Sequence, residues 1–101
     1  MRPIQVGLLG IGTVGGGTFA VLQRNREEIQ RRAGREIRIT MVADLDTERA
    51  RKIVGDAAQV VSDARAVLAN PEIDIVVELI GGYGIARTLV LEAIAAGKHV
   101  V

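Results

Sequence analysis

The beginning of the chain constrains its fold most, because an apolar run leads there into regularly spaced glycines. Residues 4–9 read as a buried β-strand, and Gly10, Gly12 and Gly15 then form the pattern G-x-G-x-x-G where a helical stretch begins. Gly10 permits a tight turn, Gly12 lets a pyrophosphate approach the backbone, and Gly15 allows close packing of the helix on the strand. The free N–H groups of that helix attract phosphates. The segment predicts a dinucleotide site, with a glycine-rich turn that binds nothing as the alternative.

The composition limits the classes of protein that this chain can represent. It has 101 residues, enough for one domain, and 49% of them are hydrophobic but only 2% aromatic, so Val, Ile, Leu and Ala must build the core. A net charge of +1 and the scarcity of aromatic residues argue against a nucleic-acid partner. Without cysteine there is no disulfide or zinc–thiolate site, and we expect no bound metal. No apolar stretch reaches the ~20 residues that span a bilayer, so we expect no membrane partner and a cytoplasmic location.

Strand-like and helical segments alternate along the whole chain, which indicates an α/β fold. The predicted strands cover residues 4–9, 36–43, 60–61, 73–80 and 98–101, and the predicted helices cover 13–33, 47–54, 63–70 and 85–96. Right-handed crossovers give the strand order 3-2-1-4-5, a Rossmann-type, doubly wound parallel sheet in three layers. We expect one dinucleotide-binding domain over residues 1–101. The fifth strand reads as truncated, so we expect an N-terminal fragment whose substrate domain is absent.

The end of the second predicted strand carries the candidate for recognition of the adenosine ribose. The fingerprint calls for an acidic residue there, and Asp44 occupies that place, 29 residues after Gly15. A carboxylate accepts hydrogen bonds from two ribose hydroxyls and repels a 2′-phosphate, so Asp44 favours NAD. The alternative is NADP, with its 2′-phosphate bound by Arg49, Arg51 and Lys52.

A second candidate segment follows the fourth predicted strand. Ligands of open α/β sheets bind where the strand order reverses, which here lies between strands 1 and 4. We therefore expect Leu79, Ile80, Gly81 and Gly82 to lie beside the glycine-rich loop and to line the nicotinamide half of the cofactor.

Three motifs together resemble the homoserine dehydrogenase family. They are Gly-Leu-Leu-Gly-Ile-Gly-Thr-Val-Gly-Gly-Gly at 7–17, Asp-Ile-Val-Val-Glu-Leu-Ile-Gly-Gly at 74–82 and Ala-Gly-Lys-His-Val-Val at 96–101. The family oxidises L-homoserine reversibly to L-aspartate 4-semialdehyde with NAD(P), in threonine, methionine and isoleucine synthesis.

The resemblance also implies roles for individual residues. Ile11, Gly12, Thr13 and Val14 are expected to contact the pyrophosphate, and the turn at 81–82 to lie beside the nicotinamide ribose. Many members carry an arginine near the end of the second strand that suits NADP, whereas Leu45 follows Asp44 here. The family's catalytic and substrate-binding residues lie downstream of this chain, so no catalytic residue is carried over. The full-length protein is expected to bind L-homoserine through its other domain and to form a homodimer.

Two other functions fit the same sequence. One is the cofactor domain of a related oxidoreductase, such as an aspartate or sugar dehydrogenase. The other is a regulatory module that senses NAD(H) and carries out no chemistry.

Overall fold

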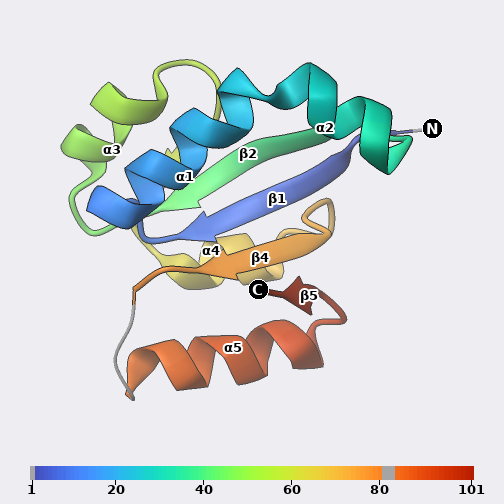
Figure 1. Ribbon diagram of the computed structural model, residues 1–101. Helices are drawn as coiled ribbons and strands as arrows, with labels where there is room; N and C mark the ends of the chain where they lie inside the picture. Colours follow the sequence, from blue (N-terminus) through green and yellow to red (C-terminus); the bar gives the residue numbers. More distant parts are fainter. Residues whose placement is uncertain (1, 81–83) are drawn as a thin grey trace.

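The chain folds into one parallel sheet with helices on both faces (Figure 1). The computed structural model describes residues 2–80 and 84–101, with the backbone alone at 13–15. The strands are β1 (Ile4–Leu9), β2 (Ile37–Ala43), β3 (Gln59–Val61), β4 (Ile75–Glu78) and β5 (His99–Val100). The helices are α1 (Thr13–Arg24), α2 (Arg26–Ala33), α3 (Thr47–Val54), α4 (Ala64–Ala69) and α5 (Ile85–Ala95).

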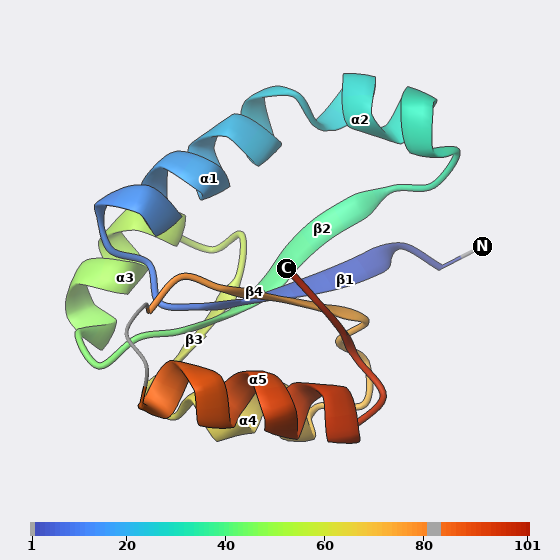
Figure 2. The same ribbon diagram turned by 60° about the horizontal axis from the view of Figure 1, so that its bottom comes forward.

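The strand order is β3-β2-β1-β4-β5 and each pair is parallel, which confirms the predicted doubly wound topology. Figures 1 and 2 place α1, α2 and α3 on one side of the sheet and α4 and α5 on the other. From β1 the chain adds β2 and β3 on one side, and it then returns to add β4 and β5 on the other side. The direction of winding therefore reverses between β1 and β4. The carboxyl ends of these two strands therefore mark the point where open α/β sheets bind ligands.

Alternating side chains of the strands divide the core into two clusters, one on each face of the sheet. Leu8 and Val42 are fully buried under α1 and α3, together with Phe19. Leu9 and Met41, their neighbours along the strands, pack on the opposite face with residues of α4 and α5. This pattern, buried on both faces, explains why an almost exclusively aliphatic sequence suits the fold.

The predicted single helix over residues 13–33 is wrong, because Asn25 divides it into α1 and α2. The Asn25 backbone (φ −103°, ψ 17°) leaves the helical conformation, and its side-chain amide donates to the Val21 carbonyl over 3.0 Å. Asparagine side chains compete in this way with the regular backbone bonds of a helix. Beyond the break, α2 ends at its C-cap Gly34, which has a left-handed φ of 72°.

One glycine within β1 is required by the packing of the second layer. A Cβ atom added to Gly7 would lie 2.4 Å from Cγ1 of Val67, a residue of α4 that is fully buried. Real carbon atoms do not approach so closely, so the fully buried Val67 side chain or its helix would have to shift. Gly7 therefore sets how near α4 lies to the centre of the sheet.

Charged residues join α2 to the beginning of β2, at the edge of the sheet opposite to the carboxyl ends of the strands. Glu36 accepts hydrogen bonds from the guanidinium groups of Arg38 and Arg26. The bond from Arg38, and then that from Arg26, lowers the pKa of Glu36 below its ordinary value. These pairs are solvent-exposed, so they hold the turn in place with little effect on stability.

Candidate dinucleotide-binding site

Backbone hydrogen bonds bring three of the strand ends together at one edge of the sheet. The Gly10 N–H donates to the Ala43 carbonyl at the end of β2 over 2.7 Å. The Leu79 N–H donates to the Leu9 carbonyl at the end of β1 over 2.9 Å. Residues 79 and 80 therefore lie beside the glycine-rich loop.

The glycine-rich loop has the shape that its sequence predicts at the two positions that the structure describes in full. Gly10 has a φ of +91°, a conformation that side chains disfavour, and a Cβ there would lie 3.2 Å from Cγ1 of Ile80. Gly12 is the N-cap of α1, and a Cβ at Gly12 would meet no described atom within 4 Å. The space next to Gly12 is thus open at the end of a helix whose first N–H groups lack intrahelical partners. These features fit a pyrophosphate.

Asp44 lies beside the glycine-rich loop, and its carboxylate is hydrogen-bonded to two backbone groups. Its Oδ2 accepts from the Ile11 N–H over 2.9 Å, and its Oδ1 accepts from the Asp46 N–H over 2.8 Å. Each oxygen of an ionised carboxylate can accept a further bond, so the group retains capacity for ribose hydroxyls. The link to Ile11 is a role that the sequence analysis missed, because only the fold brings these two residues together.

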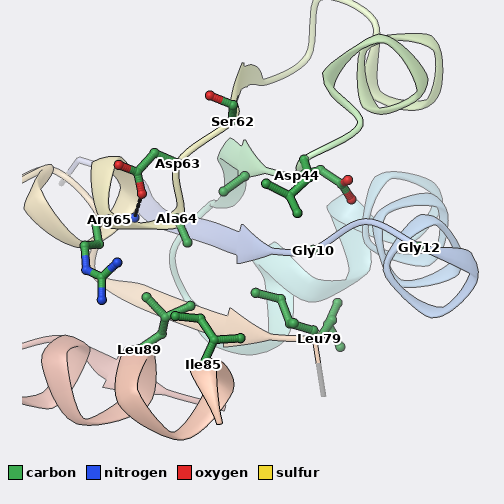
Figure 3. Close-up of a pocket in the computed structure, with 13 residues that line it drawn as sticks. Gly10, Gly12, Asp44, Ser62, Asp63, Ala64, Arg65, Leu79, Ile85 and Leu89 are labelled. Carbon is green, nitrogen blue, oxygen red and sulfur yellow. Dashed lines mark hydrogen bonds between the residues drawn. The ribbon is translucent and has the colours of Figure 1, made fainter. Parts of the chain in front are cut away.

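A cleft of about 550 Å³ extends from the glycine-rich loop over the ends of β2 and β4 (Figure 3). Leu45, 93% exposed, and Ile80, 44% exposed, both line it. An exposed aliphatic side chain at the mouth of an apolar cleft is a suitable surface for a flat ring system.

Further lining residues come from elements that the sequence analysis did not assign to the site. They are Ser62, Asp63, Ala64 and Arg65 at the beginning of α4, and Ile85 and Leu89 of α5. The strand order contained a signal for the first group, because the end of β3 must lie next to the end of β2. The contribution of α5 depends on how that helix packs, which no local pattern reveals.

The basic residues of the NADP alternative lie outside the cleft. Arg49, Arg51 and Lys52 are exposed on α3, and none of them lines the cleft. Asp46 between Asp44 and this helix is its N-cap, since its carboxylate accepts from the Arg49 N–H over 3.1 Å. The described cation that does line the cleft is Arg65.

Several predicted contact residues are described only in part or not at all. Ile11 is fully buried in the core under α1, so its backbone, not its side chain, faces the site. Thr13, Val14 and Gly15 form the first turn of α1, where the backbone alone is described. Gly81 and Gly82, together with Tyr83, lie outside the described residues.

Two kinds of feature are absent from the described part of the chain. No three histidine or acidic side chains there come together as metal ligands would. No helix there combines the length and the apolar character that crossing a membrane requires.

Comparison with known proteins agrees with this geometry. Residues 10–101 match the family model "Homoserine dehydrogenase, NAD binding domain". Homoserine dehydrogenases from Methylobacillus glycogenes and Neisseria gonorrhoeae are 65% and 55% identical over all 101 residues, and the chain spans 24% and 23% of their lengths.

Solved structures show the same relationship. A homoserine dehydrogenase from Thiobacillus denitrificans superposes with a TM-score of 0.92 at 57% identity, over 99% of this chain and 23% of that one. An NAD binding oxidoreductase from Klebsiella pneumoniae matches with a TM-score of 0.79 at 26% identity, over 98% of this chain and 26% of that one. The chain thus spans about a quarter of the length of these relatives. It binds NAD(P) and belongs to the NAD-binding domain family of homoserine dehydrogenase.

Proposed function

We propose that this chain forms the cofactor-binding part of an enzyme that oxidises L-homoserine reversibly to L-aspartate 4-semialdehyde with NAD(P). The observation that carries the proposal is the open space beside Gly12, at the beginning of α1 and next to the carboxylate of Asp44. The family match and the 65% identity to a homoserine dehydrogenase support this substrate over those of other oxidoreductases.

In this proposal the chain binds and orients the cofactor. The backbone N–H groups at residues 12–14 bind the pyrophosphate, with Ile11 fixed by Asp44 so that the loop keeps its shape. Ile80, at the end of β4, and the glycines at 81 and 82 adjoin the nicotinamide ribose. The cofactor, when bound, supplies the acceptor for the hydride of the substrate alcohol.

The cofactor preference follows from the charge at the adenosine ribose. The Asp44 carboxylate accepts hydrogen bonds from ribose hydroxyls and repels a 2′-phosphate. Arg49, Arg51 and Lys52 do not line the cleft, so none of them is in place to pair directly with a 2′-phosphate there. NAD is therefore the preferred cofactor, and NADP binds more weakly.

The remaining properties belong to the full-length protein. We propose that L-homoserine binds to a second domain, that catalytic residues come from that domain, and that the enzyme works as a cytoplasmic homodimer. The support is the family relationship and the share of the relatives' length, about a quarter, that this chain spans.

The test compares the full-length protein with the 101-residue chain. Each is mixed with NAD⁺ or NADP⁺ and with L-homoserine, L-aspartate or a sugar, and formation of the reduced cofactor is followed by absorbance. The proposal predicts that the cofactor is reduced only when the full-length protein and L-homoserine are both present. Reduction by the full-length protein with L-aspartate or the sugar but not with L-homoserine would contradict it.

A further inference from the structure

Arg65 occupies a part of the cleft to which the proposed function assigns no role. It is the second residue of α4, and with Ala64 and Leu89 it lines the end of the cleft that lies between α4 and α5 (Figure 3). The pyrophosphate site at Gly12 and the ribose candidate Asp44 lie toward the other end.

A contact from the neighbouring helix holds the guanidinium of Arg65. Its Nε lies 3.3 Å from Oε1 and 3.2 Å from Oε2 of Glu92 on α5. In the described structure, its terminal nitrogens Nη1 and Nη2 make no hydrogen bond to another residue. Glu92 therefore orients the side chain and leaves the outer edge and the faces of the guanidinium available to a ligand.

The surroundings indicate which part of a dinucleotide Arg65 would meet. A ligand with its pyrophosphate at Gly12 and its ribose at Asp44 extends its base into the remaining cleft, past the apolar side chains of Ala64, Ile85 and Leu89. A planar guanidinium at such a place stacks on a heteroaromatic ring or donates to its ring nitrogens.

We infer that Arg65 is a specificity residue that contacts the adenine base of the cofactor, and that Glu92 is a positioning residue for it. This inference rests on the proposed function of the site. It assigns Arg65 to the base and not to a 2′-phosphate, because Ala64 and Leu89, its neighbours in the cleft lining, offer an apolar surface.

The experiment measures dissociation constants of the chain for NADH, NADPH and reduced nicotinamide mononucleotide, which lacks the adenosine half, by cofactor fluorescence. Arg65→Met keeps most of the aliphatic stem and removes the guanidinium. We expect NADH and NADPH to bind about three- to tenfold more weakly, by the same factor, and the mononucleotide to bind as before. Glu92→Gln should also weaken the binding of NADH and NADPH equally, by a smaller factor, and leave the binding of the mononucleotide unchanged.

Arg87→Met is the matched control, because Arg87 is exposed on α5 and does not line the cleft. It should change none of the three constants. Unchanged NADH binding by Arg65→Met would overturn the inference, as would a loss confined to NADPH, which would assign Arg65 to a 2′-phosphate. An equal loss for the mononucleotide would show a structural role instead. If the folded wild-type chain binds none of the three, the proposed function itself fails, and the inference fails with it.

Discussion

The backbone N–H of Ile11 donates a 2.9 Å hydrogen bond to the carboxylate of Asp44, a residue 33 positions further along the chain. The bond joins the glycine-rich loop after β1 to the end of β2. The second oxygen of the same carboxylate accepts from the Asp46 N–H before α3. Asp44 thus fixes the loop that is to receive the phosphates, as well as being the candidate for ribose recognition.

The first prediction concerns the contribution of this carboxylate to stability. Asp44→Asn replaces one acceptor oxygen by an amide group, so one of the two backbone N–H groups loses its partner. We expect the free energy of unfolding to fall by about 1–3 kcal/mol, as measured by urea denaturation. Glu48→Gln on the exposed surface of α3 is the control and should change it by less than about 0.5 kcal/mol. Equal stability of the two variants would show that the hydrogen bond lost from Asp44 contributes nothing.

The second prediction separates binding from folding at the glycine-rich loop. Gly12→Ala adds a methyl group to open space, so the protein should still fold, with a loss of at most about 1 kcal/mol at the helix cap. The same methyl group occupies the approach of the pyrophosphate, and we expect NADH binding to weaken by at least about tenfold.

Gly17→Ala provides the matched comparison within the same helix, since a Cβ there also meets nothing within 4 Å. It should leave NADH binding unchanged and stabilise α1 by about 0.5–1 kcal/mol. Equal effects of the two alanines on NADH affinity would argue that Gly12 does not face the ligand.

The third prediction tests the close packing of α4 on β1. Gly7→Ala should destabilise the protein by about 1–3 kcal/mol, because its new Cβ would lie 2.4 Å from Cγ1 of Val67. Val67→Ala alone leaves a cavity, but it also removes the clashing methyl group. The double variant should therefore be more stable than the sum of the single effects predicts, as a double-mutant cycle in urea would reveal. Additive effects would mean that the clash is relieved elsewhere.

The fourth prediction concerns cofactor choice at the mouth of the cleft. Leu45 is almost fully exposed directly after Asp44, so an arginine fits there without disturbing the core. Leu45→Arg should tighten NADPH binding relative to NADH several-fold, since a guanidinium pairs with a phosphate in bidentate fashion. Leu45→Gln serves as the uncharged control. An unchanged preference in the arginine variant would place the 2′ position of the ribose away from Leu45.

Most helix bounds could be predicted because local patterns determine them, and the strand order followed from the right-handed crossovers of a doubly wound fold. The predicted helix over residues 47–54 matches α3, and the predicted helix over residues 63–70 begins at Asp63, the N-cap of α4. The fourth predicted strand, 73–80, proved longer than β4, whose regular pairing covers Ile75–Glu78. Its first part is joined to β1 through the carboxylate of Asp74, which accepts from the Gln5 N–H over 2.9 Å.

Other features depend on contacts that periodicity does not encode. In α1, for example, the apolar residue Val21 is 50% exposed, whereas Phe19 is buried. Likewise, the spacing of residues placed Asp44 at the end of a strand but gave no sign of its bond to Ile11. Arg65 entered the site only because the end of β3 and the helix that follows it turn toward the cleft.

The most direct test of the account is to titrate NADH and NADPH separately into the chain and to repeat both titrations with Asp44→Ser. We predict tighter binding of NADH by the wild-type chain, and loss or reversal of that preference in the variant, with the fold of each confirmed by circular dichroism. Equal or tighter binding of NADPH by the wild-type chain would contradict the assignment of Asp44 to the adenosine ribose.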